Sequence, residues 1–311
     1  MKVDDIRKVL IIGAGTMGQQ IGFQCALHGC GVALYDVSQD VLDKSGVRLK
    51  KLAAEFTAAG KLSAEACAAV LARLTLTTDA AAAAAEADLV SESVPEDPQL
   101  KARVFAQFND LCPERTVFTT NTSSLVPSMF AGATGRPDKF LAFHFHDVRL
   151  TNMVDIMPHP GTSPETVALV GAFAARIGQV AIVLEKENHG YLFNAMLMEW
   201  MKTAQTLASR GVAGIEDIDR AWMGVMHAPV GPFGIMDSIG LDTALKVTDY
   251  WAGVLNDPQA KMNADFLRRY VAAGKLGVKS GGGFYDYPNP AYGRPGFVEG
   301  RTSSPPASKV P

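Results

Sequence analysis

The chain has 311 residues, of which 48% are hydrophobic and 20% charged, and its formal net charge is −3. This length is typical of two domains, and the composition is that of a globular protein. Proteins that bind nucleic acid usually present a basic surface, so the slightly acidic balance argues against that class and favours a small-molecule substrate.

The N-terminal segment MKVDDIRKVLIIG carries acidic residues where an export signal would be basic. Its apolar stretch is too short for export or for a membrane span, so no membrane partner is expected. Four cysteines, none of them in a CxxC pair, are interpreted as reduced thiols of a cytoplasmic protein: Cys25, Cys30, Cys67 and Cys112.

A nucleotide-binding pattern opens the chain. KVLII (8–12) is typical of a strand buried on both faces, GAGTMG (13–18) follows it, and the next residues have helical spacing. GVALYD (31–36) is a second strand and ends in Asp36, 23 positions after Gly13. Strand, Gly-x-Gly-x-x-Gly, helix, strand and acid in this order predict a dinucleotide site, although the glycines alone would also fit a tight turn without a ligand.

Each residue of the glycine loop has a physical role in that prediction. Gly13 makes the tight turn, Gly15 lets a pyrophosphate approach the backbone, and Gly18 allows the helix to pack closely on the strand. The helix begins where Thr16 and Met17 lie, so its free N–H groups and the positive end of its dipole meet the phosphates.

The acid at the end of the second strand indicates which dinucleotide binds. Asp36 is expected to accept hydrogen bonds from the adenosine ribose hydroxyls and to repel a 2′-phosphate. No arginine follows it closely, so the predicted cofactor is NAD rather than NADP.

The alternation of strands and helices continues to about Lys186 and then stops. Further strands are predicted at 74–78, 88–94, 116–123, 139–145, 154–157 and 179–185, and helices at 41–56, 80–87, 98–112 and near 164–177. We therefore predict an α/β Rossmann-type N-terminal domain over 1–186 and an all-α C-terminal domain over 187–287.

Two further segments carry expectations of their own. The helix at 191–208 is apolar on several faces, which favours burial in a dimer. The tail at 288–311 is rich in proline, glycine and serine and is expected to wander over the surface or to be disordered.

From residue 8 to about residue 287, the chain resembles the short-chain L-3-hydroxyacyl-CoA dehydrogenases. The motifs that carry the resemblance are VLIIGAGTMG (9–18), NTSSL (121–125), HF (144–145), the helix opening with Gly190 and Asn194, GPF with GLD (231–242) and GGGFYDY (281–287). The resemblance implies a Rossmann-plus-helical fold, NAD as cofactor and a homodimer formed through the helical domain.

The resemblance also implies catalytic residues. His144 aligns with the family's catalytic base, and Asp155 aligns with the acid that orients it, one residue nearer along the chain and one methylene shorter. Ser123 and Asn194 align with groups that hydrogen-bond the substrate oxygen. An imidazole suits this chemistry because it can take and return the hydroxyl proton near neutral pH.

Three more residues are implied as cofactor contacts. Glu96 and Lys101 align with residues near the nicotinamide half, and Lys279 aligns with a contact in the C-terminal glycine motif. Without the resemblance, polar residues such as Ser123 and Asn194 would also fit local structural roles.

A second histidine, His146, lies two residues after His144. The HxH spacing on a strand puts both rings on one face, which suits a metal. A third ligand is not evident in the sequence and hydride transfer needs no metal, so no metal site is expected.

The chain departs from the family next to its histidines. Asp147 and Val148 stand where the family has an Asn-Pro pair. An ionised Asp147 cannot donate to a thioester carbonyl and would repel developing negative charge. Either it points away, or His146 or Arg149 takes over its contact.

Other departures concern the helical domain and the CoA portion. Ala195 replaces an arginine of the family pattern, and the positions that match CoA contacts fall on Leu52 and Ala59, neither of which is polar. The CoA part of the prediction therefore has the least support.

The leading hypothesis is NAD-dependent oxidation of a short-chain L-3-hydroxyacyl-CoA to the 3-oxoacyl-CoA, and the reverse reduction. A second hypothesis keeps the chemistry with a free 3-hydroxy acid of the gulonate or carnitine type, whose carboxylate Arg149 would bind. A third is a non-catalytic dinucleotide-binding relative, which the intact His144 and Asp155 argue against.

Overall fold

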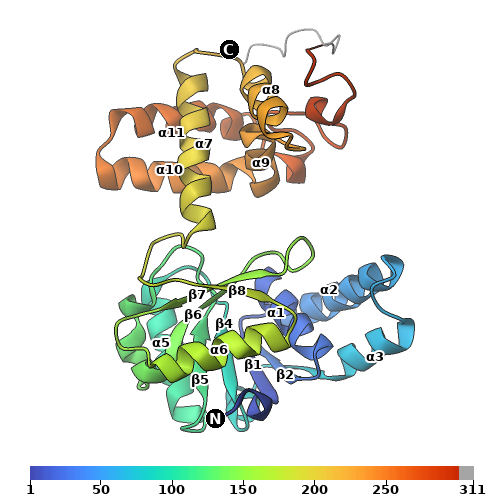
Figure 1. Cartoon of the computed structure of the whole chain (residues 1–311), viewed down its shortest axis with the longest axis vertical. Coiled ribbons are helices and arrows are strands. Elements are labelled where there is room, and N and C mark those ends of the chain that lie inside the picture. The colour runs from blue at the N-terminus through green and yellow to red at the C-terminus, as the bar shows by residue number, and fades with distance from the viewer. Residues whose placement is uncertain (301–311) are drawn as a thin grey trace. The chain divides into compact units, whose positions relative to one another are not determined.

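The structure, a computed structural model, describes residues 1–300 apart from the side chains at 254 and 255. It divides into two compact units, of which one ends at Leu192 and the other begins at Phe193 (Figure 1). The predicted fold class, a Rossmann-type α/β domain followed by an all-α domain, is confirmed.

The N-terminal unit is built on one eight-stranded sheet in the order β3-β2-β1-β4-β5-β6-β7-β8. The strands are β1 (Lys8–Ile12), β2 (Gly31–Tyr35), β3 (Leu74–Thr77), β4 (Leu89–Glu92), β5 (Val117–Thr120), β6 (Phe140–Phe145), β7 (Met153–Pro158) and β8 (Val180–Val183). β1 to β6 pair in parallel, whereas β7 runs antiparallel to β6 and parallel to β8. The strand order reverses between β1 and β4, which is where open α/β sheets bind ligands.

Six helices connect these strands: α1 (Thr16–Leu27), α2 (Gln39–Ala58), α3 (Ala64–Ala72), α4 (Ala80–Ala84), α5 (Pro98–Leu111) and α6 (Pro164–Arg176). Sequence analysis did not predict α3. Its start was signalled by Ser63, whose hydroxyl accepts a hydrogen bond from the Ala66 N–H at 3.2 Å, as an N-cap residue should.

Alternate residues of the strands supply two separate cores. Val9 and Ile11 of β1 face the cluster that includes Phe173 of α6, while Leu10 and Ile12 face the cluster around Phe105 of α5. Because both faces of the sheet are covered, its strands read as continuous apolar runs, and this is why KVLII was recognisable as a buried strand.

The C-terminal unit consists of α7 (Phe193–Ser209), α8 (Ile215–Met226), α9 (Pro232–Ile239), α10 (Leu241–Leu255) and α11 (Pro258–Ala272). Phe233, Met236 and Leu267 are fully buried at its centre. In the part of the chain that the structure describes, no helix is both long and apolar enough to cross a membrane.

A buried carboxylate holds the start of α9. Asp219 of α8 accepts hydrogen bonds from the N–H groups of Phe233 and Gly234 and from the hydroxyl of Tyr285. A Cβ atom on Gly231 would lie 2.6 Å from the Asp219 backbone, so this approach requires glycine. The GPF motif is thus explained by packing within this unit.

We expect the unfolding free energy of the C-terminal unit to decrease as the pH rises from about 4 to about 6, because of Asp219. Burial, opposed by hydrogen bonds, raises the pKa of Asp219 from its ordinary value of 3.8 to about 6. The folded state therefore binds this proton more tightly than the unfolded state, and the stabilisation present at low pH is lost as pH rises. Two pKa units correspond to roughly 3 kcal/mol.

Urea unfolding of the wild-type chain and an Asp219→Asn variant at both ends of that range would check this expectation. Asparagine does not ionise, so the unfolding free energy of the variant relative to wild type should rise by about 2–3 kcal/mol as pH increases. A constant difference between the two proteins would show that Asp219 does not titrate in this range.

Part of the tail packs against the helical unit. The Phe297 ring is buried, and the guanidinium of Arg220 lies over it at 4.9 Å from the centroid. Tyr292 meets the ring of Tyr285 edge-on. Of the two expectations for the tail, residues 288–300 therefore fit a path over the surface held by individual contacts rather than disorder, and residues 301–311 lie outside the described part of the chain.

Candidate active site

The predicted site residues of the N-terminal unit follow neighbouring strands at one edge of the sheet. Gly13 follows β1, Asp36 follows β2, Glu96 comes after β4, Ser123 comes after β5, and His144 lies near the end of β6. Since β1 to β6 are parallel, their carboxyl ends share one edge, and the topology gathers these residues there.

The three glycines of the loop are required for different reasons. A Cβ on Gly13, whose φ is +102°, would lie 2.6 Å from the Ser93 carbonyl oxygen, and one on Gly18 would lie 1.9 Å from the Gly13 oxygen. A Cβ on Gly15 would meet nothing within 4 Å. Open space over Gly15, at the N-terminus of α1, fits the pyrophosphate of a dinucleotide.

Asp36 is held in place by the same loop. Its carboxylate accepts hydrogen bonds from the Ala14 N–H at 3.0 Å and the Ser38 N–H at 3.1 Å. Thr16 and Met17 begin α1, where helix N–H groups have no partner within the helix. The loop and Asp36 together therefore fit NAD.

We expect a Gly15→Ala variant to fold normally and to bind NADH more weakly. The φ of Gly15 is −67°, which alanine adopts without strain, and the added Cβ would enter the open space. A displaced pyrophosphate should raise the Kd by roughly 10- to 100-fold, from an overpacking cost of about 1–3 kcal/mol. NADH fluorescence titration beside a thermal melt would measure both effects, and an unchanged Kd would contradict the assignment.

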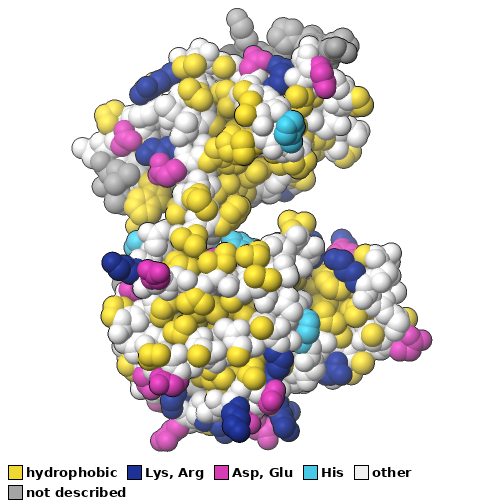
Figure 2. Space-filling model, in the orientation of Figure 1, with side chains coloured by type: hydrophobic (Ala, Val, Ile, Leu, Met, Phe, Trp, Pro, Cys, Tyr) yellow, Lys and Arg dark blue, Asp and Glu magenta, His cyan; other side chains and the backbone are white. Residues whose placement is uncertain are grey.

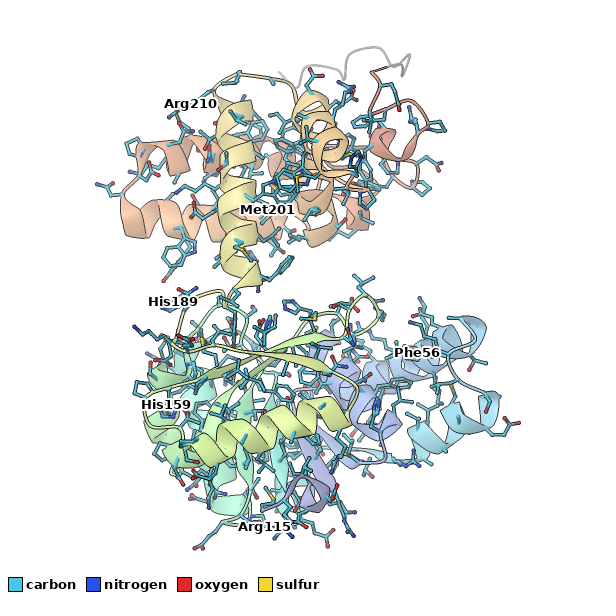
Figure 3. All side chains as sticks on the ribbon, viewed as in Figure 1. Phe56, Arg115, His159, His189, Met201 and Arg210 are labelled. Carbon is cyan, nitrogen blue, oxygen red and sulfur yellow. The ribbon has the colours of Figure 1, made fainter. Side chains whose placement is uncertain are left out.

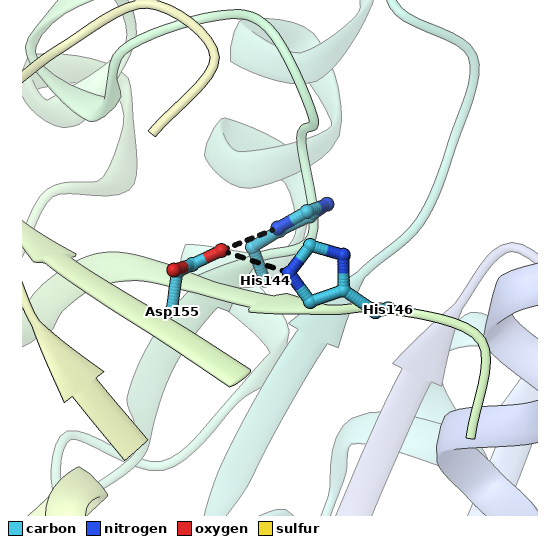
Figure 4. Close-up of side chains that lie close together, drawn as sticks. All are labelled: His144, His146 and Asp155. Atoms are coloured by element: carbon cyan, nitrogen blue, oxygen red, sulfur yellow. Dashed lines mark hydrogen bonds and ion pairs between the residues drawn. The ribbon is translucent and has the colours of Figure 1, made fainter. Parts of the chain in front are cut away.

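β6 and β7 bring the predicted base and its acid together. His144 and Asp155 lie directly opposite each other in the antiparallel register, and both are buried. The Nδ1 atom of His144 lies 3.1 Å from Oδ2 of Asp155 (Figure 4). The shorter spacing and shorter side chain noted in the sequence therefore still permit the contact.

A tyrosine that the sequence analysis did not single out holds the imidazole. The ring of Tyr191 stacks on that of His144, with 4.6 Å between centroids and 15° between planes. Its hydroxyl donates to the Thr122 carbonyl oxygen at 2.6 Å. Its φ of +56°, directly after Gly190, is unusual for an aromatic residue, and this strain is the kind kept at functional sites.

The surroundings set the protonation of the pair. Burial lowers the pKa of His144 below its ordinary value, although the Asp155 carboxylate opposes this. Burial would raise the pKa of Asp155, but hydrogen bonds from His144 and His146 outweigh it and bring the pKa to about 2. At neutral pH Asp155 is thus ionised and His144 neutral, with Nδ1–H donating and Nε2 able to accept a proton.

Glu96 organises the loop that carries Ser123. Its Oε1 atom accepts hydrogen bonds from the N–H groups of Ser123 and Ser124, both at 3.0 Å, and from the hydroxyl of Thr122. Asn121 ties this loop to β6, because its side-chain oxygen accepts from the Phe145 N–H at 2.7 Å.

Lys101 lies inside the protein. Its ammonium donates to Glu92 at 2.7 Å and lies 3.4 Å from Glu96, and its side chain is 1% exposed. The ammonium is thus enclosed by protein groups, and it influences the site through Glu96. Sequence analysis did not single out Glu92, although an acid ending an apolar strand was a usable signal.

Two predicted residues belong to the C-terminal unit. Lys279 pairs with Asp242, with its ammonium 2.6 Å from Oδ1. Asn194 is the second residue of α7. Their roles toward cofactor and substrate stay predictions.

A glycine loop at the switch point, an acid directly after β2 and a buried His–Asp pair are the arrangement expected of an NAD-dependent oxidoreductase. Family models described as the NAD-binding and C-terminal domains of 3-hydroxyacyl-CoA dehydrogenase match residues 8–188 and 190–287. The chain belongs to the 3-hydroxyacyl-CoA dehydrogenase family, and the predictions of that family and of NAD as cofactor are confirmed.

Relatives cover nearly the whole chain. It is 33% identical over 284 residues to the probable 3-hydroxybutyryl-CoA dehydrogenase of Bacillus subtilis, covering 91% of this chain and 98% of the relative. It is 34% identical over 288 residues to the mitochondrial hydroxyacyl-coenzyme A dehydrogenase of Rattus norvegicus, covering 91% of each. A solved diketoreductase, described as acting on dicarbonyl compounds, is 38% identical, with a TM-score of 0.84, over 91% of this chain and 99% of its own.

Proposed function

We propose that this chain oxidises a short-chain L-3-hydroxyacyl-CoA to the 3-oxoacyl-CoA and catalyses the reverse reduction, with His144 as the proton acceptor. The observation that carries the proposal is the buried His144–Asp155 pair at the edge of the sheet where the glycine loop lies. Family membership supports the reaction and the substrate class.

The residues of the chain would divide the work as follows. Nε2 of His144 takes the hydroxyl proton while Asp155 stabilises the imidazolium that forms. NAD, when bound, accepts the hydride from the same carbon. Ser123 and Asn194 would orient the substrate oxygen as charge develops on it.

The remaining predicted contacts concern the cofactor. Glu96 would reach the nicotinamide half of NAD, with Lys101 holding its carboxylate in place. Lys279 would make the contact implied for the C-terminal glycine motif.

Asp147 does not present an unpaired charge. Arg149 donates to both of its carboxylate oxygens, with Nε 2.9 Å from Oδ1 and Nη2 2.5 Å from Oδ2. The hydrogen bond from Arg149 also keeps the pKa of Asp147 below its ordinary value. Because Arg149 already holds one carboxylate, it is less suited to bind the carboxylate of a free hydroxy acid.

A non-thioester dicarbonyl substrate is the second candidate. It is supported by the similarity to the diketoreductase and by the apolar residues Leu52 and Ala59 at the positions that match CoA contacts. With such a substrate, His144 and NAD would keep their roles, and no groups that bind a CoA portion would be needed.

The deciding experiment compares NADH oxidation with acetoacetyl-CoA, with free acetoacetate and with a simple diketone, beside a His144→Ala control. Turnover of the thioester alone, lost in the control, would establish the proposal. Faster turnover of a non-thioester would transfer the assignment to the second candidate. Binding of NADH without turnover of any of the three would favour a non-catalytic relative.

We propose further that the chain forms a homodimer through α7 and α8. Within one chain, α7 buries only Ala204 and Gln205 among its described residues. Exposed apolar side chains gather on the helical unit (Figure 2), and those of α7 and α8 are Phe193, Met196, Leu207, Trp222, Val225 and Met226. Such a patch on a helical unit favours association.

Light scattering on the purified chain would test the dimer, with a Met196→Glu variant as comparison. A wild-type mass equal to one chain would contradict it.

The four buried, unpaired cysteines support a reducing compartment such as the cytoplasm.

A further inference from the structure

His146 brings a third donor atom to the His144–Asp155 pair. Its Nε2 atom lies 3.2 Å from Oδ2 of Asp155, the same oxygen that His144 contacts at 3.1 Å (Figure 4). These two nitrogens and the carboxylate oxygen all lie within 4.8 Å of one another. No third ligand for an HxH metal site is evident in the sequence, but the antiparallel register of β6 and β7 supplies one in Asp155.

The spacing of these atoms is close to what a zinc ion needs. Zinc binds imidazole nitrogen and carboxylate oxygen at about 2.0–2.2 Å, so two ligands of a tetrahedral site lie about 3.4 Å apart. The distances from Oδ2 of Asp155 to the two histidine nitrogens, 3.1 and 3.2 Å, are already near that value. His146 lies just beyond the end of β6 and its side chain is partly exposed. Movement of its ring would be needed to set the third separation, between the two histidine nitrogens.

No second zinc site competes with this cluster among the described residues. Among the described residues, this is the one group of three or more His, Cys, Asp or Glu side chains with converging donor atoms. His159 and His189, which are labelled in Figure 3, contact the carbonyl oxygens of Pro137 and Ser124 respectively. The four cysteines are buried.

We propose that His144, His146 and Asp155 bind one Zn²⁺ ion reversibly, and that this ion switches the dehydrogenase off. Two imidazoles and one carboxylate are a common donor set for zinc, and a fourth position remains for water. The ion would replace the two hydrogen bonds that Asp155 now accepts.

The chemistry explains the loss of activity. A neutral imidazole has one ring proton, and a metal ion on Nδ1 leaves that proton on Nε2. His144 would then have no lone pair for the substrate hydroxyl, and Asp155 would be committed to the ion. The inhibition rests on the proposed function, whereas the binding rests on the geometry alone.

The experiment titrates Zn²⁺ into the full chain, first freed of metal by a chelator, and follows heat and NADH oxidation in parallel. We expect one Zn²⁺ per chain, loss of activity as that site fills, and recovery when the chelator is restored. His146→Phe and His146→Gln should each weaken zinc affinity by roughly 10- to 100-fold or more. His28→Gln, which changes an exposed histidine, should bind as wild type does.

The two measurements separate the possible failures. Absence of a stoichiometric heat signal, or binding that both His146 variants retain, would overturn the site. Binding at this site without loss of activity would overturn the switch. A metal-free wild-type chain that is inactive toward every substrate would instead count against the proposed function, and the titration by heat would still decide the site.

Discussion

A His144→Gln variant is expected to lose about 10²- to 10⁴-fold in kcat while binding NADH as wild type does. Glutamine keeps the polarity of the side chain but cannot take up a proton, and proton removal accompanies hydride transfer. In the wild-type chain His144 is fixed by Asp155 on one side and by the Tyr191 ring on its face, which hold its imidazole in one orientation. The NADH assay with the best substrate and a fluorescence titration would measure the two quantities.

An Asp155→Asn variant gives the matched comparison. An amide that donates to Nδ1 would favour the tautomer with the proton on Nε2, where it blocks proton uptake. A large fall in kcat with little change in KM is expected, because the acid acts through His144.

Activity of His144→Gln within about threefold of wild type would remove His144 from the mechanism, since a general base contributes far more than that.

Much of the N-terminal unit was predictable because its strands are buried on both faces and because steric contacts require glycines in the loop at 13–18. Gly13 is required by its positive φ and by the close approach of the Ser93 carbonyl oxygen, Gly18 by the oxygen of Gly13, and Gly15 by space for a ligand. These requirements fall on closely spaced positions, so they leave a pattern that a single sequence shows.

The resemblance suggested the His144–Asp155 pair, but not why the shortened spacing works. That depends on the β6–β7 register, which places the two residues opposite each other. The roles of Tyr191 and Glu92 were missed for a related reason. Tyr191 acts through a contact with His144, far away in the sequence, and Glu92 through a contact with Lys101 of the following helix, and neither contact leaves a periodic signal.

The tail shows the limit of composition as a guide. Proline, glycine and serine predicted a segment that wanders over the surface or is disordered, whereas in residues 288–300 the buried Phe297 ring lies against Arg220 and Tyr292 meets Tyr285. Composition averages over a segment, whereas the contacts of individual aromatic rings decide where it packs.

Replacing Lys101 with alanine is expected to destabilise the N-terminal unit by about 3–5 kcal/mol, because it leaves a buried carboxylate without its partner. Glu92 is fully buried, and burial raises its pKa even with Lys101 present. Without the ammonium, folding must either retain a buried charge or bind a proton. The loss should therefore be smaller at acidic pH, where Glu92 is protonated in both states.

A double variant separates this charge effect from lost packing. In Lys101→Met with Glu92→Gln, both charges are absent, the amide oxygen of the glutamine can accept from the Val94 N–H, and its amide N–H can donate to the Thr120 hydroxyl. Its unfolding free energy should recover most of the loss, since replacing a buried ion pair by neutral groups is often close to neutral. If it is as unstable as Lys101→Ala, the volume of the lysine stem matters more than its charge. Because Lys101 also holds Glu96, restored stability with activity still reduced would separate the support of the Ser123 loop from the stability of the fold.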